Sequence, residues 1–323
     1  MPNAVQVEKI DENSEGQRID NYLFKQLKGV PKSHIYQILR SGQVRVNSKR
    51  IAADYRLQLD DAVRIPPLKL TFKSEQSGSS TRAYSTRFEK LYEDEWLIAI
   101  NKPSGVAVHG GSGISYGVIE QLRQQHPEWK FLELVHRIDR DTSGVLLLAK
   151  KRKALIDLHQ QIREGAVQKL YWVLVKGKWT NTKQNVKLLL NKFVTASGER
   201  RVAVIDGREQ VDKELFSHTI FMLEQNWPDY SLLKAELKTG KTHQIRVHLA
   251  HLGFPIVGDE KYGDFEFNRQ LFRKNQKLKR MFLHAGTFEV VHPITGILLK
   301  VMAPLPKEFI GFIDWLNQET IQG

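Results

Sequence analysis

The sequence predicts an α+β fold, with a mixed or antiparallel β-sheet core flanked by helices and loops, preceded by a small basic domain. Three observations lead to this prediction. Helical and strand patterns alternate unevenly after Phe88, without the regular strand–helix repeat of a doubly wound sheet. Residues 67–86 lack apolar periodicity and are rich in Ser, Thr and Gly, as linkers are. With 323 residues, the chain exceeds the usual size of one core, so two domains are expected.

The predicted basic domain spans residues 16–66. It carries ten Lys or Arg against four Asp, a net charge of 10 − 4 = +6, whereas the whole chain has +13. Apolar side chains recur at helical spacing over residues 19–27, and a second helix is predicted at 33–40. Short strands are predicted at 44–51, around an Asn-Ser turn, and at 63–65. The segment therefore has the elements of a small domain of its own.

The second predicted domain spans residues 87–323. Apolar runs and alternation predict strands at 91–92, 96–101, 145–149, 170–175 and 231–237. A helix is predicted at 154–163, and another follows Thr242 as its N-cap and ends at Gly253. Strands thus outnumber helices and do not alternate with them regularly, which favours an α+β domain.

The composition excludes several classes of protein. No run approaches the roughly 20 apolar residues that span a bilayer, and the polar N-terminus shows no secretory signal, so a cytoplasmic protein without membrane association is expected. Cysteine is absent, which excludes disulfides, thiolate zinc sites and cysteine nucleophiles. The net charge of +13 favours a polyanionic partner, because each phosphate that a protein neutralises releases counterions.

The densest polar segment is His136-Arg137-Ile138-Asp139-Arg140-Asp141-Thr142-Ser143-Gly144, which lies between two apolar stretches. Charged residues between buried elements are costly unless they are paired, so such loops are often functional. Two flanking arginines favour the anionic form of Asp139, as a nucleophile or base requires. On this segment alone, a catalytic loop and a surface ion-pair loop remain equally compatible with the sequence.

Three further stretches place polar residues at the ends of predicted elements. They are Asn101 to His109, Gln168 to Tyr171 and Thr239 to Leu249. In the last of these, Arg246 falls in the first turns of the predicted helix, where its guanidinium can reach a carboxylate from another loop.

These stretches, together with the Asp139 loop, resemble the RluA family of pseudouridine synthases. The resemblance runs from Phe88 to about Pro306, and its most specific motifs are HRIDRDTSG and HQIRVHLAHLGFPIVGDEKYG. Ile138 replaces the usual leucine, a conservative change. Residues 16–66 resemble the S4 RNA-binding domain, which presents Lys and Arg to structured RNA.

The resemblance implies that the chain isomerises uridine to pseudouridine in 23S ribosomal RNA, with large-subunit precursors as the partner and uridines 955, 2504 and 2580 as targets. The target base would be flipped out of its stack, cut from its sugar by an aspartate-dependent step, rotated and rejoined through carbon 5. Substrate and product are isomers, so no cofactor and no metal is expected. A monomer is the default expectation.

The resemblance also implies roles for individual residues. Asp139 matches the catalytic aspartate, Tyr171 the active-site tyrosine that packs on the base, and Arg246 the basic residue that pairs with the aspartate. Arg137 matches the arginine that helps to displace the target nucleotide. Further contacts with substrate or RNA are expected from charged or imidazole side chains of both domains: His136, Arg140, Lys169, Lys102, Arg18, Lys32, Arg40 and Arg45.

Three alternatives remain open. A non-catalytic S4-type RNA-binding or ribosome assembly protein has no need of the Asp139 loop. A synthase of the same family that modifies other ribosomal or transfer RNA uridines is separated only by mapping. A zinc site is disfavoured because His243 and His248 are five residues apart and do not share one helical face.

Overall fold

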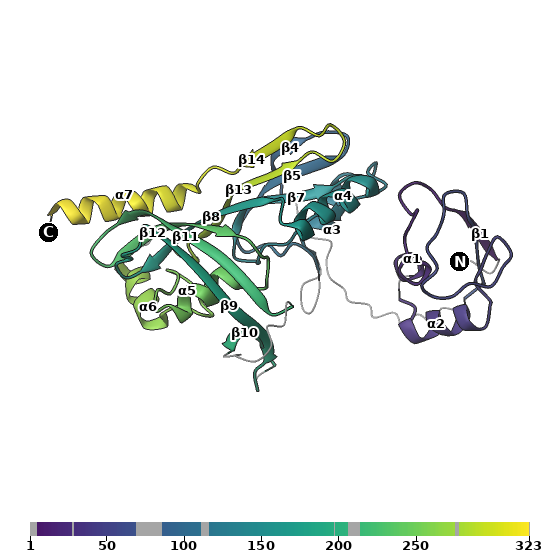
Figure 1. Cartoon of the computed structure of the whole chain (residues 1–323), viewed down its shortest axis with the longest axis horizontal. Coiled ribbons are helices and arrows are strands. Elements are labelled where there is room, and N and C mark those ends of the chain that lie inside the picture. Colours follow the sequence, from purple (N-terminus) through teal and green to yellow (C-terminus); the bar gives the residue numbers. More distant parts are fainter. Residues whose placement is uncertain are drawn as a thin grey trace. The chain divides into compact units, whose positions relative to one another are not determined.

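The computed structural model describes residues 5–27, 29–68, 86–110, 116–196, 198–205, 214–274 and 278–322. The chain divides into two compact units, residues 1–85 and 86–323, and each is described by itself (Figure 1). Most of the predicted linker, residues 69–85, lies outside the described residues. Among the helices of the described ranges, none has both the length and the apolar character to cross a bilayer.

The first unit is a three-stranded antiparallel sheet with two helices. Its elements are β1 (Gln6–Lys9), α1 (Ile19–Gln26), α2 (Lys32–Arg40), β2 (Arg45–Val46) and β3 (Ala62–Ile65), and the strand order is β1-β3-β2. Ile19, Leu23 and Ile35 are fully buried in the core that joins the two helices to the sheet. Both helices lie where the apolar spacing predicts them.

Two details of this unit depend on hydrogen bonds and not on apolar packing. The predicted turn is formed by Asn47 and Ser48, both with positive φ, and the Asn47 side chain bridges to Asp61 and to the backbone N–H of Ala62. Strand β1 was not predicted, because its sequence is polar and half of its residues are charged. Backbone pairing with β3 forms it without an apolar face.

The second unit is built on one large sheet. Its strands are β4 (Glu89–Glu93), β5 (Leu97–Lys102), β6 (Glu133–Leu134), β7 (Ser143–Ala149), β8 (Gln168–Lys176), β9 (Lys183–Val194), β10 (Arg200–Ile205), β11 (Phe216–Asn226), β12 (Tyr230–Leu237), β13 (Leu283–Val291) and β14 (Leu298–Met302). The strand order is β10-β9-β11-β12-β8-β13-β7-β5-β4, with β14 beside β13 and β6 beside β7. Strands β13 and β7 pair in parallel, and the other described pairs are antiparallel. The predicted mixed sheet is thereby confirmed.

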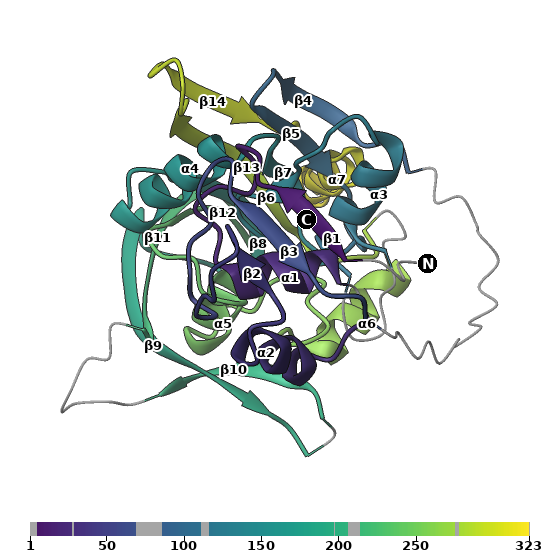
Figure 2. The ribbon, with the colours of Figure 1, turned by 90° about the vertical axis from the view of Figure 1, so that its right-hand side faces the viewer.

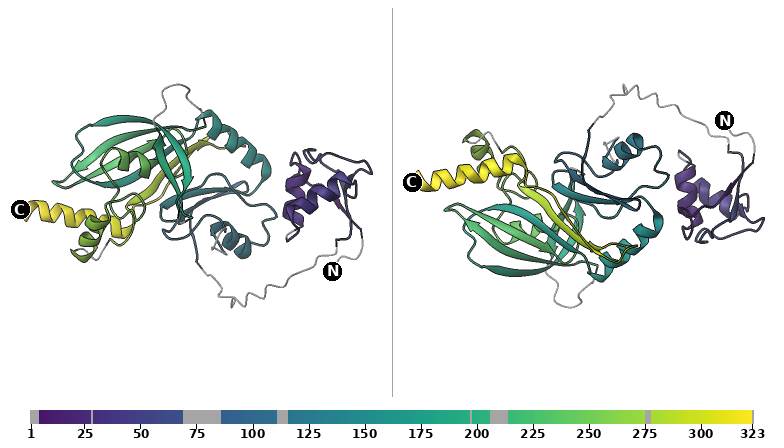
Figure 3. Two further views of the ribbon diagram at one scale, coloured as in Figure 1. Left: turned by 90° about the horizontal axis from the view of Figure 1, so that it is seen from below. Right: turned by 90° about the horizontal axis from the view of Figure 1, so that it is seen from above.

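Helices cover both faces of this sheet. They are α3 (Val118–Gln125), α4 (Arg152–Glu164), α5 (Gln244–His251), α6 (Phe265–Lys274) and α7 (Lys307–Gln322). On β7, Leu146 and Leu148 belong to a core shared with α3 and α5, whereas Val145 and Leu147 belong to one shared with α4. Burial on both faces explains why this strand is an apolar run and not an alternating one. Figure 2 shows the hairpin of β9 and β10 projecting from the sheet, and Figure 3 shows α7 leaving one end of the unit.

The parallel pair at the centre of the sheet fixes the end of the Asp139 loop. Gly144, the second residue of β7, has φ +109° and lies opposite Ala285 of β13. A Cβ at this position would lie 2.2 Å from the Ala285 carbonyl oxygen, so only glycine fits. The end of the polar loop before Gly144 is therefore fixed relative to strand β13.

Candidate active site

The loop between β6 and β7 is clamped by the turn that follows β5. The Ser104 Oγ donates to the Asp141 carbonyl at 2.7 Å, and the Gly105 N–H donates to the Arg140 carbonyl at 2.9 Å. These bonds join two stretches that are about forty residues apart in the sequence. The turn therefore fixes the backbone of the loop directly after Asp139.

Lys102 binds the backbone of both segments. Its side chain is fully buried, and its Nζ donates to the carbonyls of Pro103, Val106 and Arg140 at 2.8, 2.8 and 2.9 Å. Burial lowers the pKa of Lys102 to about 7, against the charges of two nearby aspartates. An amine in this position has no surface to offer RNA, so the contact predicted for Lys102 gains no support from its place in the fold.

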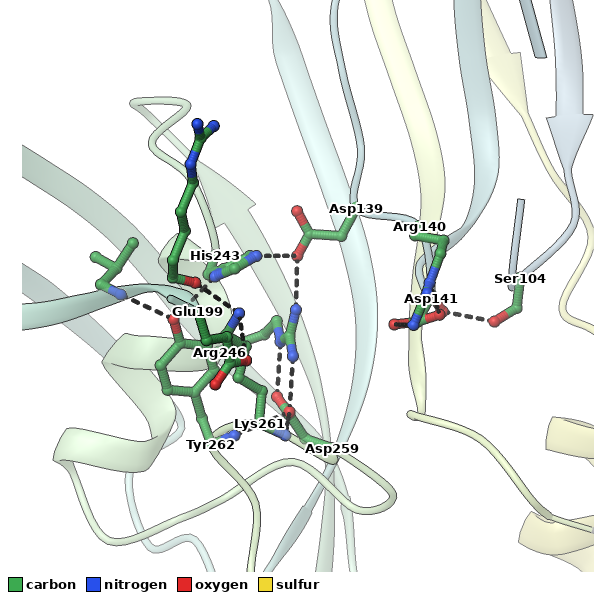
Figure 4. A network of polar contacts seen from close by, with 12 residues as sticks. Ser104, Asp139, Arg140, Asp141, Glu199, His243, Arg246, Asp259, Lys261 and Tyr262 are labelled. Carbon is green, nitrogen blue, oxygen red and sulfur yellow. Dashed lines mark hydrogen bonds and ion pairs between the residues drawn. The ribbon is translucent and has the colours of Figure 1, made fainter. Parts of the chain in front are cut away.

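Asp139 accepts a hydrogen bond from an arginine that a second aspartate holds (Figure 4). The Arg246 Nη1 donates to Asp139 Oδ2 at 3.1 Å, while its Nε and Nη2 donate to Asp259 at 2.7 and 2.8 Å. Asp259 is 1% exposed and also accepts the backbone N–H groups of Lys261 and Tyr262. Burial opposes the charge on Arg246, but its bonds to Asp259 keep the pKa of the guanidinium above its ordinary value.

A cavity of about 720 Å³ opens beside this pair and is lined by Asp139, Tyr171 and Arg246. Tyr171 lies on β8 and is almost fully buried. Burial, and then the charge of Asp139, raises the pKa of its phenol, so the hydroxyl stays protonated. Its neighbour Trp172 packs in a different core on the opposite face of the sheet, as strand alternation predicts. The cavity therefore joins a carboxylate, a cation and an aromatic wall.

Arg137 lies at the surface of the same cavity. Its Nη1 is 3.3 Å from His109 Nε2, and His109 Nδ1 is 2.9 Å from the Gly110 carbonyl oxygen. Since Nδ1 donates to that carbonyl, Nε2 is free to accept from Arg137. His109 thus holds an exposed guanidinium beside the opening, a partner that the sequence did not indicate.

His136 is hydrogen-bonded to strand β7 through its Nε2 atom. Its Nε2 accepts the backbone N–H of Leu147 at 3.1 Å, and its ring stacks on Phe288 at 4.6 Å. Burial, and then the charge of Lys169, lowers the pKa of His136 to about 3, so the ring is neutral. Lys169 also lines the cavity, and burial lowers its pKa. Both residues predicted to contact the substrate therefore border the cavity, His136 with one nitrogen already engaged.

His243 occupies an unusual position beside Asp139. The structure corrects the predicted cap: α5 begins after His243, not after Thr242, and His243 has φ +54°. Thr242 is displaced because the Gln244 side chain reaches back to accept the Lys241 N–H at 3.0 Å. The His243 Nε2 lies 3.9 Å from Asp139 Oδ2, and its Nδ1 lies 2.9 Å from the Tyr262 hydroxyl.

A second cavity, of about 580 Å³, lies on the other side of the Asp139 loop. Its lining includes Arg140, Lys261, Lys279 and Arg280. Arg140 is exposed, pairs with Asp141 at 3.0 Å and is part of the lining of both cavities. The same lining carries Asp139, Asp141, Glu199 and Glu260, and Lys261 pairs with Glu199 at 2.8 Å, so the second cavity has a lining of mixed charge.

The predicted RNA-contacting residues of the first unit lie on its surface or are tied to it. Lys32 and Arg40 are exposed at the two ends of α2, and Arg45 is exposed on β2. Arg18 is half-buried and donates to both oxygens of Asp20, at 3.2 and 2.7 Å. Lys32, Arg40 and Arg45 are therefore accessible on this unit, whereas Arg18 forms an ion pair with the buried Asp20.

Sequence reasoning missed the supporting residues of the site. Asp259 and Tyr262 lie in a motif that was recognised as diagnostic, but no spacing rule assigned them a role. His243 was considered only as a metal ligand. Within the described ranges, no group of three or more His, Cys, Asp or Glu side chains is arranged to hold a metal ion.

Comparisons with known proteins identify the family of the chain. The sequence profile of the RNA pseudouridylate synthase family matches residues 96–251, and that of the S4 domain matches residues 17–63. The ribosomal large subunit pseudouridine synthase C of Salmonella typhi is 48% identical over 98% of both chains. The protein of the same description from Escherichia coli K12 is 49% identical over 94% of both chains.

Solved structures of lower identity share the fold. Human RNA pseudouridylate synthase domain containing 4 has 24% identity and a TM-score of 0.55, over 71% of this chain and 93% of its own. Human RNA pseudouridylate synthase domain containing 1 has the same identity and TM-score, over 68% and 84%. These two structures support the architecture of the sheet and its helices.

Proposed function

The chain belongs to the RNA pseudouridylate synthase family and carries an S4 domain, and from this premise we propose that it isomerises uridine to pseudouridine in 23S ribosomal RNA. One observation carries the proposal: the Asp139 carboxylate, bound by Arg246, faces a cavity walled by Tyr171. The relatives that match the whole chain are described as acting on the large ribosomal subunit, which supports this RNA as the substrate.

Arg246 prepares Asp139 for the reaction. Because Asp259 binds two of its nitrogens, the guanidinium is fixed and turns a third nitrogen toward Asp139. A cation at this distance favours the ionised carboxylate, which is the form that attacks the sugar or the base or removes a sugar proton. Only one oxygen of Asp139 is bound by Arg246, so the other oxygen is available to the substrate.

Tyr171 supplies a flat wall for the detached uracil. Its hydroxyl remains protonated because burial raises its pKa, so the ring acts by packing and by hydrogen bonding, not as a base. A base freed from its sugar must turn without leaving, and stacking on an aromatic ring holds it during that step. Arg137, held by His109 at the edge of the cavity, is placed to enter the gap that a flipped nucleotide leaves.

Lys102 supports the site by holding the loop. Its amine and the turn that contains Ser104 both bind the backbone that follows Asp139. Arg140 and Lys169 are assigned to RNA contact at the rims of the cavities, and His136 to anchoring of the loop. Preorganised support of this kind keeps a reacting carboxylate within a fraction of an ångström of its productive position.

The first unit supplies sequence-independent affinity for RNA. We assign residues 16–66 to this S4 function, 67–86 to the linker and 87–323 to catalysis. Lys32, Arg40 and Arg45 are the exposed cations assigned to phosphate contact, and Arg18, which is half-buried and paired with Asp20, is the fourth residue assigned to RNA. The protein acts as a cytoplasmic monomer on large-subunit precursors, and the expected targets are the three 23S uridines named above.

The test is direct mapping of pseudouridine. Purified protein is incubated with 23S transcripts and, separately, with large-subunit precursors, and carbodiimide adducts are located by primer extension. New stops at uridines 955, 2504 and 2580 support the assignment. Stops at other uridines only would reassign the substrate within the family, and a lack of any stop with either RNA would contradict the proposed function.

A further inference from the structure

The isomerisation must move one proton. In pseudouridine, the sugar C1′ is bonded to carbon 5, and nitrogen 1 carries a hydrogen. Once carbon 5 has joined C1′, it bears both the sugar and its original hydrogen. Loss of that proton leaves its electron pair to restore the C5=C6 double bond, while nitrogen 1 takes up a proton. The site therefore needs a group that accepts a proton near neutral pH.

Most groups of the cavity are poor acceptors. Burial raises the pKa of Tyr171, so at neutral pH its oxygen already holds a proton. Arg246 does not release a proton in proteins. His136 has a pKa of about 3, and its Nε2 already accepts a backbone N–H. The remaining titratable side chains of the lining are His109, His159, Lys169, Lys241 and His243, and of these His243 lies 3.9 Å from Asp139.

His243 is held in place at an energetic cost. Its φ of +54° lies in the left-handed region, where a side chain with a Cβ is strained. Such strain persists only where surrounding structure imposes it, and it gathers at functional sites. Here the imidazole lies beside Asp139 in the lining of the cavity, and 17% of its side chain is exposed.

Tyr262 fixes the far nitrogen of the ring (Figure 4). Its hydroxyl oxygen accepts the backbone N–H of Val202 at 3.0 Å and lies 2.9 Å from His243 Nδ1. A proton on Nδ1 can be donated to this oxygen, which leaves the lone pair of Nε2 facing the cavity. When Nε2 takes a proton, its new N–H faces Asp139 Oδ2, 3.9 Å away, so the cation has an anion beside it.

Burial of the ring keeps it neutral until then. Burial lowers the pKa of His243 below 6.5, with Arg246 of α5 and Lys261 of the following loop acting in the same direction. Asp139 and Asp259 act in the opposite direction. A neutral imidazole at pH 7 is therefore ready to accept a proton, whereas an ionised one would not be.

We propose that His243 Nε2 accepts the proton that uracil loses at carbon 5, and that a proton returns from this ring to nitrogen 1. The inference rests on the proposed function, because it assigns a step within that reaction. His243 is then a catalytic residue, and Tyr262 is the residue that positions it. No redox change and no further reactant is involved, since the proton only changes its carrier.

The test uses His243→Asn, because asparagine tolerates the left-handed backbone better than other residues, with His243→Gln as a second variant. Single-turnover rates are measured with RNA whose target uridine carries either hydrogen or deuterium at carbon 5. The rate should fall on the order of 10²-fold, and the C5 deuterium isotope effect should exceed that of the wild type. His126→Asn removes a half-buried histidine that stacks on Trp129 and is not part of the cavity lining, so it should change neither quantity.

A third substrate separates this step from the earlier ones. RNA with 5-fluorouridine at the target has no proton to lose at carbon 5, so the variants should rejoin this base to its sugar as fast as the wild type does. Equal slowing on both RNAs without an isotope effect would overturn the inference, as would an isotope effect that appears in Lys169→Gln instead. A wild type that converts neither RNA would contradict the proposed function itself.

Discussion

Asp259 has no place in the reaction, yet the structure predicts that its charge is required. Asp259→Asn keeps the size of the side chain but replaces one carboxylate oxygen by an NH₂ group. Asp259 Oδ2 accepts the Arg246 Nε at 2.7 Å and its Oδ1 accepts the Nη2 at 2.8 Å, so the amide turns a donor toward one of these donors whichever way it is oriented. A buried charge pair with one partner removed costs about 3–5 kcal/mol.

The magnitude can be read in two assays. For a domain of this size, 1 kcal/mol changes Tm by roughly 2–4 °C, so a loss of about 3 kcal/mol lowers Tm by roughly 6–12 °C. The single-turnover rate should fall on the order of 10²-fold, because Arg246 no longer holds Asp139 in register and a displacement of about 1 Å costs that much. Both are measured on the full chain, by differential scanning calorimetry and by pseudouridine formation.

A matched control removes the charge of a surface pair. Glu266→Gln breaks the contact of Glu266 with Arg269, in which both side chains are 63% exposed, and should leave Tm and rate unchanged. The reasoning is refuted if Asp259→Asn melts and reacts as the wild type does. A lowered Tm with an unchanged rate would show that Asp259 stabilises the fold without orienting Arg246.

Three further outcomes are expected. Lys102→Met removes the Nζ donor from the carbonyls of Pro103, Val106 and Arg140, and the Arg140 carbonyl keeps only the Gly105 N–H. Tm and turnover should therefore fall, while the salt dependence of RNA binding, measured by filter binding, stays the same. A slope reduced by about one would instead show a phosphate contact. Deletion of residues 1–66 should weaken RNA binding and flatten its salt dependence, and unchanged binding with a steep slope would contradict the role of the S4 domain. Burial lowers the pKa of His136, His248 and His284 to about 3, 4 and 4, so below pH 6.5 the unfolded chain takes up protons that the folded chain does not. Stability is therefore complete above pH 6.5 and lost as the pH falls toward 4, and a Tm that stays flat from pH 7 to 5 would show that these rings are charged in the fold.

Local patterns in the sequence were sufficient to predict the main elements of the fold. The strand at 145–149 and the helix at 154–163 are apolar in ways that only burial explains, and both are present as β7 and α4. The contact of Arg246 with the carboxylate of another loop also follows from its place in the first turn of α5. Such features depend on side-chain periodicity, which a single sequence displays.

The remainder depends on contacts between distant segments. Strand β1 exists through backbone bonds to β3, which carry no side-chain signature. Asp259 reaches Arg246 only after the chain turns back from α5. Lys102 is of a residue type that is usually exposed, but in this fold it is fully buried. His243 could not be predicted in the left-handed region, because the fold and not the residue type imposes that conformation.

The most direct test concerns Asp139 in a strain that lacks this gene, complemented with either the wild type or Asp139→Asn. Pseudouridine in 23S RNA is mapped by carbodiimide and primer extension, and RNA affinity is measured on the purified proteins. The wild type should restore a defined set of stops, and Asp139→Asn should restore none while binding RNA nearly as well. Restoration of the stops by Asp139→Asn would contradict the assignment of Asp139 as the catalytic carboxylate.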